Sequence, residues 1–241
     1  MPDNPRRDGL LSLADGQSES LKPKIAIVDD DAGARKALAR LIASAGYATD
    51  SFASAAELLA SAGLEQFNGV VADLRMPVTD GLELQRALGE RDPALAVVII
   101  TGHADIPASV SAMKAGAVDF LEKPARAKHL QAAIARMIEH TQRQRQSLAA
   151  GNDRRTRYET LTPREREVFA LVAAGLLNKQ AAAHLGITEK TVKQHRARVM
   201  AKMKAESVAD LAVLAEALGA RPSVEDLREA RGLSARSDSA G

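Results

Sequence analysis

The sequence of 241 residues has no cysteine, no tryptophan and only 2% aromatic residues. The absence of cysteine excludes disulfides, thiolate nucleophiles and cysteine-ligated zinc or iron–sulfur centres. So few aromatic side chains argue against a stacking platform for single-stranded nucleic acid. No apolar run approaches about 18 residues, and residues 1–20 carry acids instead of an apolar segment, so we expect neither a membrane span nor a secretory signal. These absences predict a cytoplasmic protein with no membrane partner.

A strong net charge is also missing from the chain as a whole, which carries +2. The balance changes along the sequence: residues 23–140 contain 12 basic and 15 acidic residues, residues 141–157 contain 5 and 1, and residues 158–219 contain 9 and 7. From Lys190 to Lys204 there are six basic residues and no acid. An acidic first half followed by a concentrated basic segment is typical of a regulated nucleic-acid binder.

Residues 23–140 alternate short apolar runs with segments whose apolar residues recur at helical spacing. The apolar runs cover residues 25–28, 49–52, 70–72, 96–100 and 117–121. Continuous apolar strands that alternate with helices are typical of a parallel sheet covered on both faces. We therefore expect residues 23–140 to form an α/β domain with a five-stranded, doubly wound parallel sheet.

Residues 158–219 carry the start and stop signals of four short helices. The expected N-terminal caps are Thr162, Asn178, Thr188 and Ser207. Glu165 stands at the capping-box position after Thr162, and Pro163 occupies the first helical position. A glycine-containing turn separates the second and third helices, so we expect a small all-α helix-turn-helix domain.

The remaining segments lack the pattern of a packed domain. We expect residues 1–22 to be a flexible arm and residues 220–241 to be a polar tail. Residues 141–157 are rich in Gln and Arg and contain Gly151-Asn152-Asp153, which predicts a linker. The apolar stripe of the preceding helix ends after Ile138, so we expect this helix to extend beyond its domain without forming a stable coiled coil.

Acidic side chains follow two of the predicted strands. Asp29–Asp31 follow the first run, and Asp73 follows the run at residues 70–72. Ligands of an open parallel sheet bind beyond the carboxyl ends of its strands, where Thr101 and Lys123 are also expected. Converging carboxylates repel one another unless a cation binds, and a set of oxygen ligands suits Mg²⁺. The sequence therefore predicts a Mg²⁺ site.

Four motifs lie at these strand ends. They are IVDDD at 27–31, DLRMP at 73–77, TGH at 101–103 and DFLEKP at 119–124. Together they resemble the receiver domain of two-component response regulators of the FixJ/NarL type. The resemblance implies a flavodoxin-like fold and a cis bond between Lys123 and Pro124. The sequence departs from the family at Ala125, where a phenylalanine is usual, which predicts looser packing under the last helix of the domain.

The resemblance also implies a set of roles in phosphorylation. Asp73 would accept a phosphoryl group from a sensor histidine kinase. Asp30, Asp73 and the backbone carbonyl of Arg75 would bind Mg²⁺, and Asp29 would help through water. Phosphoryl transfer needs an in-line nucleophile and charge neutralisation on the phosphoryl oxygens, which such a site supplies.

Three further residues would bind or respond to the phosphoryl group, as the resemblance implies. Lys123 would contact its oxygens, and Thr101 would hydrogen-bond it and move towards it. Phe120 would turn inward into the vacated space, which would change the surface of the fourth helix and fifth strand.

Three motifs in the second half are LTPREREV at 161–168, NKQAA at 178–182 and TEKTVKQHR at 188–196. They resemble the LuxR-type helix-turn-helix over about residues 159–219, with a departure at Ala181, where a larger aliphatic residue is usual. Double-stranded DNA is therefore the expected partner.

The third helix of this domain is expected to enter the major groove. Helical spacing turns Val192, Val199 and Met203 inward and presents the opposite face to DNA. On that face Lys193 and Gln194 are expected to read bases, beside Lys190. Phosphate contacts are expected from Lys179, Thr191, Arg196, Arg198 and Lys202.

Three residues have alternative interpretations. Asp31 is either part of the acidic site or a helix cap. His103 has no assignable carboxylate partner, and we interpret it as a loop residue. His195 either contacts a phosphate or packs against the inner face of its helix.

The leading hypothesis is a phosphorylation-controlled transcription factor, and no enzyme beyond its own phosphoryl transfer and dephosphorylation. Phosphorylation would favour a homodimer through the fourth helix and fifth strand, with RNA polymerase as a further partner. One alternative is a phosphorylation-independent DNA binder that uses its first domain only to dimerise. Another is an aspartyl-phosphate hydrolase, against which Arg75 argues because such enzymes carry an acid two residues after the nucleophile.

Overall fold

The computed structural model describes residues 22–102, 110, 112–114 and 116–222. The predictions for the arm at residues 1–21, for His103, for most of the fourth helix and for residues 223–241 lie outside this range. The chain divides into two compact units at the bond between Arg145 and Gln146, and each unit is described by itself.

The first unit is built on a five-stranded sheet whose strands all run parallel. The strands are β1 Lys24–Val28, β2 Ala48–Phe52, β3 Gly69–Asp73, β4 Val97–Thr101 and β5 Asp119–Glu122. Their order, β2-β1-β3-β4-β5, places β1 and β3 side by side in the centre. The predicted doubly wound sheet is confirmed, and the carboxyl ends of all strands meet at one edge.

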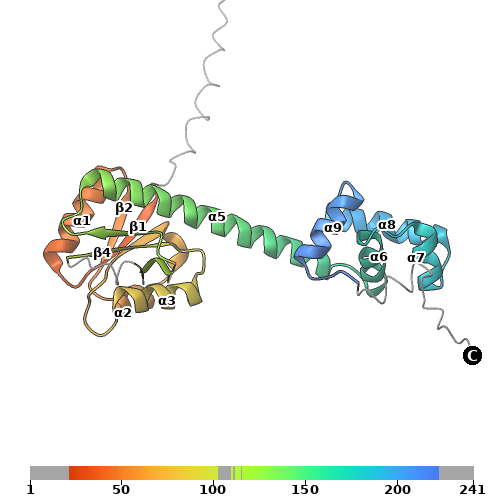
Figure 1. Ribbon diagram of the computed structural model, residues 1–241, viewed down its shortest axis with the longest axis horizontal. Coiled ribbons are helices and arrows are strands. Elements are labelled where there is room, and N and C mark those ends of the chain that lie inside the picture. The colour runs from red at the N-terminus through yellow and green to blue at the C-terminus, as the bar shows by residue number, and fades with distance from the viewer. Residues whose placement is uncertain (1–21, 103–109, 111, 115, 223–241) are drawn as a thin grey trace, which may run out of the picture. The chain divides into compact units, whose positions relative to one another are not determined.

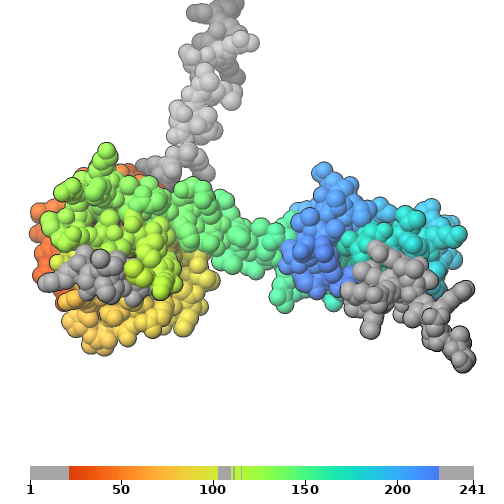
Figure 2. All heavy atoms as spheres, viewed as in Figure 1, coloured from red at the N-terminus to blue at the C-terminus, as the bar shows by residue number. Residues whose placement is uncertain are grey.

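Helices cover both faces of this sheet (Figure 1). They are α1 Ala32–Ser44, α2 Ala55–Ala60, α3 Gly81–Arg91 and α5 Ala127–Glu159, with a 3₁₀ turn, η1, at Leu64–Gln66. Successive strand side chains point to opposite faces, so one apolar cluster packs with α2 and α3 and another packs with α1 and α5. In the space-filling view the yellow and orange atoms of the segment that contains α2 and α3 lie along one side of this unit, and the green atoms of α5 lie along the other (Figure 2).

Helix α5 continues through the segment predicted to be a linker. The turn-forming residues Gly151 to Asp153 do not end it, because i,i+4 ion pairs such as Arg155–Glu159 support the exposed helix. Within the first unit, Thr141 is buried and its hydroxyl accepts a hydrogen bond from the Ala96 amide. Beyond Ile138, α5 therefore still contacts the sheet domain.

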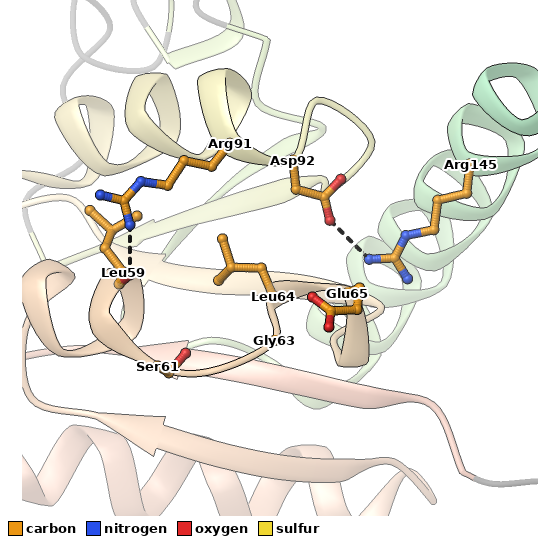
Figure 3. A pocket seen from close by; sticks show the side chains of 8 residues that line it. All are labelled: Leu59, Ser61, Gly63, Leu64, Glu65, Arg91, Asp92 and Arg145. Carbon is orange, nitrogen blue, oxygen red and sulfur yellow. Dashed lines mark hydrogen bonds and ion pairs between the residues drawn. The ribbon is translucent and has the colours of Figure 1, made fainter. Parts of the chain in front are cut away.

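Arg145 makes the last contact of α5 within the first unit. Its guanidinium donates to the Phe67 carbonyl at 2.9 Å and to Asp92 at 3.1 Å. Figure 3 shows the Arg145–Asp92 pair beside a cavity of about 440 Å³. Arg91, which also lines this cavity, donates a hydrogen bond to the Leu59 carbonyl. Both arginines are thus bound to the domain's own main chain.

The second unit contains the predicted helices α6 Pro163–Ala173, α7 Asn178–Leu185, α8 Glu189–Met203 and α9 Val208–Ala217. Thr162, Thr188 and Ser207 cap their helices as predicted. Asn178 does not: Leu177 is the N-cap residue of α7, and the Asn178 side chain accepts a hydrogen bond from Arg196. Gly186 has a left-handed backbone (φ +64°) that makes the turn between α7 and α8.

Candidate phosphorylation site and DNA-binding helix

Two buried carboxylates share one lysine at the carboxyl edge of the sheet. Asp29 follows β1 and is fully buried, while Asp73 ends β3 and is 5% exposed. Lys123 follows β5 directly, and its ammonium lies 2.5 Å from Asp29 Oδ2 and 2.7 Å from Asp73 Oδ1. The sheet thus brings together three side chains that are up to 94 residues apart in the sequence.

The other oxygens of the two carboxylates bind backbone amides. Asp29 Oδ1 accepts from the Asp31 amide at 3.0 Å, and Asp73 Oδ2 accepts from the Arg75 amide at 2.9 Å. Asp31 itself caps α1 by accepting from Ala34, so the capping interpretation of Asp31 is confirmed. Asp30 and Arg75 are exposed beside this pair.

Thr101 lies on β4 and Phe120 on β5, the two strands that follow β3 in the sheet order. Thr101 ends β4, is 1% exposed, and its carbonyl accepts from the Lys123 amide at 2.7 Å. Phe120 lies in β5, is half-buried and packs against the cluster under α2 and α3. The Lys123–Pro124 bond is cis, as expected. A cavity of about 360 Å³ lies beside Ala125, against α1.

The pocket brings together two carboxylates and one ammonium, so negative charge exceeds positive charge. Burial raises the pKa of Asp73, and the charge of Asp29 adds to this rise, whereas the hydrogen bond and charge of Lys123 oppose it. Burial acts to lower the pKa of Lys123, but its hydrogen bonds to Asp29 and Asp73 outweigh burial and raise this pKa. One ammonium therefore does not fully compensate two buried carboxylates.

This imbalance fits a divalent cation. Within the part of the chain that the structure describes, no three acidic or histidine side chains are gathered closely enough to be a complete metal site. The donor set is nevertheless made of oxygens alone, which suits Mg²⁺. A cation bound here would balance the negative charge of the buried carboxylates and of exposed Asp30 beside them. The resemblance to receiver domains implies Mg²⁺ at this edge of the sheet.

Two residues that support the pocket were missed by the sequence reasoning. The Arg35 guanidinium donates to the backbone carbonyls of Asp29 and Asp30. Gly81 packs against the main chain of Asp73, and a Cβ added there would lie 2.5 Å from the Asp73 carbonyl oxygen. The glycine directly after the cap residue Asp80 is the only signal in the sequence for Gly81, and no sequence signal identifies the contacts of Arg35.

The outer face of α8 is exposed and basic, as predicted. Val192, Val199 and Met203 are fully buried in the core of the second unit. The exposed residues of the opposite face are Lys190, Lys193, Gln194, Ala197 and Arg198, and Lys179 is exposed on α7. Among the described residues, Lys193 forms a single surface ion pair, with Glu189 at 3.2 Å, which leaves it available to a ligand.

Other DNA-contact candidates are engaged within the domain. Arg196 is half-buried and bonds Asn178, and the Thr191 hydroxyl lies 2.8 Å from that of Thr188. His195 is half-buried, and its Nδ1 is shielded with no hydrogen-bond partner in the described chain, which favours packing over phosphate contact.

Lys202, for which a phosphate contact is predicted, is also engaged within the domain. Its ammonium lies 2.6 Å from Glu165 Oε2 and donates to the Thr160 carbonyl at 2.9 Å. Glu165 is 2% exposed, and the Lys202 bond together with the Thr162 amide lowers the pKa of Glu165. The lysine therefore holds α8 to the start of α6, because a buried carboxylate requires a partner.

Comparisons with known proteins agree with both units. Residues 25–135 match the response regulator receiver domain, and residues 159–215 match the bacterial regulatory proteins of the luxR family. The transcriptional regulatory protein FixJ of Rhizobium meliloti is 45% identical over 82% of this chain and 97% of its own length. Nodulation protein W of Bradyrhizobium diazoefficiens is 42% identical over 83% of this chain and 88% of its own length.

A solved relative and the helix lengths complete the comparison. The structure of response regulator StyR matches with a TM-score of 0.72 and 40% identity, over 81% of this chain and 98% of that chain. Among the described residues, no helix is long and apolar enough to cross a membrane. The chain belongs to the two-component response regulators of the FixJ type and is a phosphorylation-dependent transcriptional regulator, with a receiver domain followed by a LuxR-family DNA-binding domain.

Proposed function

We propose that a sensor histidine kinase phosphorylates this regulator on Asp73, and that phosphorylation promotes dimerisation and promoter binding through α8. The observation that carries the proposal is the pair of buried carboxylates, Asp29 and Asp73, joined by Lys123 at the carboxyl edge of the sheet. Of the two, Asp73 is 5% exposed, whereas Asp29 is fully buried. It is thus the carboxylate that a phosphodonor can reach.

The chain's own residues supply positioning and charge for the transfer. A carboxylate oxygen of Asp73 attacks the phosphorus of the donor, and the bond from phosphorus to the donor's leaving atom breaks. Lys123 already contacts Asp73 Oδ1, so its ammonium is placed to bind the transferred phosphoryl oxygens. Thr101, on the adjacent strand, would hydrogen-bond the same group, and Phe120 would follow it inward.

Asp30, Asp73 and the carbonyl of Arg75 are the proposed Mg²⁺ ligands, with Asp29 acting through water. A bound Mg²⁺ would neutralise charge on the phosphoryl oxygens. The Arg75 amide, which holds Asp73 Oδ2 at 2.9 Å, fixes the backbone that presents this carbonyl. The receiver's part in its own dephosphorylation would use the same residues, without a separate substrate site.

For DNA binding, Lys193 and Gln194 would read base edges, and Lys190 and Arg198 would support them with positive charge. Phosphate contacts are further proposed for Lys179, Thr191, Arg196 and Lys202, the last three after release from their contacts within the domain. The proposal includes a cytoplasmic location, where promoter DNA would be bound, and RNA polymerase as a further partner. Residues 23–140, 141–157 and 158–219 are the proposed receiver, linker and DNA-binding domain.

Intact-mass spectrometry tests the phosphorylation directly. The full-length protein is incubated with acetyl phosphate and Mg²⁺, and its mass and oligomer size are compared with those of Asp73→Asn. Asp80→Asn is the matched control, because Asp80 caps α3 in the following loop and asparagine also caps helices. We expect one added phosphoryl group and a larger oligomer in the wild type and the control only. Labelling of Asp73→Asn to the wild-type extent would refute the assignment.

A further inference from the structure

The loop that carries the acidic pair is held by an arginine that the proposed chemistry does not use. The Arg35 guanidinium lies in the first turn of α1 and its Nη1 donates to the Asp29 carbonyl at 2.5 Å and to the Asp30 carbonyl at 3.0 Å. We propose that Arg35 is a positioning residue for Mg²⁺ binding, acting through the main chain of Asp29 and Asp30. This inference rests on the proposed function.

The two acids depend on the main chain to different degrees. Asp29 is fixed by its own side chain, through Lys123 and the Asp31 amide. Asp30 is exposed, and its carboxylate makes no hydrogen bond or ion pair with the described residues. The direction of the Asp30 carboxylate is therefore set by its backbone, and Arg35 is the side chain that holds that backbone.

The position of Arg35 is unfavourable for helix stability alone. The positive end of the helix dipole lies at the N-terminus, so a cation in the first turn is disfavoured there. The first turn of α1 contains no acidic residue that would offset it. The compensation comes from the two carbonyl acceptors, since hydrogen bonds from a charged donor are stronger than neutral ones. The same contacts that retain the arginine also orient the acidic loop.

Removal of residues that orient metal ligands typically weakens metal binding by about 10–100-fold. We therefore expect Arg35→Ala to raise the dissociation constant for Mg²⁺ about tenfold or more. The chemistry of Asp73 itself is unchanged, so the rate of labelling by acetyl phosphate at saturating Mg²⁺ returns to within about twofold of wild type. The loss thus falls on the Mg²⁺ concentration required and not on the maximal rate.

Arg35→Lys separates charge from geometry. A lysine keeps the positive charge, but its side chain is shorter than the arginine side chain, whose terminal Nη1 makes both carbonyl contacts. We expect an intermediate dissociation constant for Mg²⁺, nearer to that of Arg35→Ala than to wild type. Because this variant keeps the charge and most of the aliphatic stem, it decides the question if Arg35→Ala does not fold.

Isothermal titration of the unphosphorylated, full-length protein with MgCl₂ measures the effect without any phosphoryl transfer. Arg40→Ala is the matched control, because Arg40 is exposed on the same helix and makes no hydrogen bond or ion pair with the described chain. Circular dichroism and the thermal midpoint report folding. Weakened Mg²⁺ binding in the Arg35 variants alone supports the inference.

Unchanged Mg²⁺ affinity in a folded Arg35→Ala or Arg35→Lys, or equal weakening in Arg40→Ala, overturns the positioning role. Failure of the proposed function is a separate result: Asp73→Asn would then be labelled like the wild type, whatever the Arg35 variants do. A lower thermal midpoint with normal Mg²⁺ affinity would mean that Arg35 serves stability only, and it also overturns the inference.

Discussion

Each unit of this regulator buries a carboxylate against a lysine, and the two pairs differ in how well the charges balance. In the DNA-binding unit, Glu165 has one lysine, Lys202, and the Thr162 amide, and its pKa is lowered. In the receiver, Asp73 must share Lys123 with Asp29, and its pKa is raised. The Glu165–Lys202 pair is therefore saturated, meaning that its charges balance, whereas the group of Asp29, Asp73 and Lys123 still lacks positive charge.

The difference separates a structural pair from a reactive one. A buried carboxylate that is fully paired has no further ligand to bind, and removal of one partner destabilises the fold because it leaves an uncompensated buried charge. A buried carboxylate that is only partly compensated lowers stability and favours binding of a cation. The same residue types therefore hold α8 in place in one unit and prepare phosphoryl chemistry in the other.

The largest expected effect is on the reactive pair. Among the described residues, Lys123 is the cation that contacts Asp73, so Lys123→Met should lower the rate of labelling by acetyl phosphate by about 10²-fold or more. Quenched-flow labelling with intact-mass detection gives this rate. Lys128→Met, which alters an exposed lysine in the first turn of α5, serves as the control and should label normally. A loss of less than about threefold would remove Lys123 from the reaction.

The saturated pair should respond in stability instead. Glu165→Gln leaves Lys202 without its counter-ion and should destabilise the DNA-binding unit by about 2 kcal/mol. Hydrogen exchange of the α6 and α8 amides measures this unit separately from the receiver. Glu167→Gln, on the exposed side of α6, is the matched control. If the labelling rate of Asp73 falls instead, the two pairs are not functionally distinct.

Acid should destabilise the DNA-binding unit, through loss of the saturated pair, by no more than Glu165→Gln does. Because the pKa of Glu165 is lower in the folded state than the ordinary value of 4.5, its contribution is fully present above pH 4.5 and is lost as the pH falls through the folded pKa. Urea unfolding followed through NMR signals of α8 should show this loss in the wild type. A similar pH dependence in Glu165→Gln would assign the loss to other groups.

The smallest effect has the opposite sign. Because burial raises the pKa of Asp73, its charged form is unfavourable at neutral pH, and Asp73→Asn should stabilise the receiver by about 1 kcal/mol without Mg²⁺. Hydrogen exchange of β3 and β4 at pH 7 measures the change, with Asp80→Asn as the reference. Destabilisation of the receiver by Asp73→Asn would make the two units alike and contradict the comparison.

The sequence was sufficient to predict the strands, most helix caps and the convergence of Asp29, Asp73 and Lys123. Buried parallel strands are continuous apolar runs, and caps such as Thr188 act within three residues of their partners. Asn178 was misplaced because Leu177, a residue with no capping side chain, stands at the start of α7.

The features that the sequence did not predict are contacts that join distant parts of the chain. Lys202 lies on the basic helix, but its partner Glu165 is 37 residues away, so helical spacing alone could not predict this ion pair. The return of Arg35 to the acidic loop depends on a side-chain conformation that no periodicity encodes. The continuation of α5 through Gly151 follows from surface ion pairs that outweigh a weak turn signal.

The position of the phosphoryl group is the most direct test of the account. Borohydride reduces an aspartyl phosphate to homoserine, so tandem mass spectrometry of the reduced, digested protein locates the modified acid. After treatment with acetyl phosphate and Mg²⁺, we predict homoserine at position 73 and at no other aspartate. Homoserine at Asp29 or Asp30, or its absence from position 73 in labelled protein, would contradict the account.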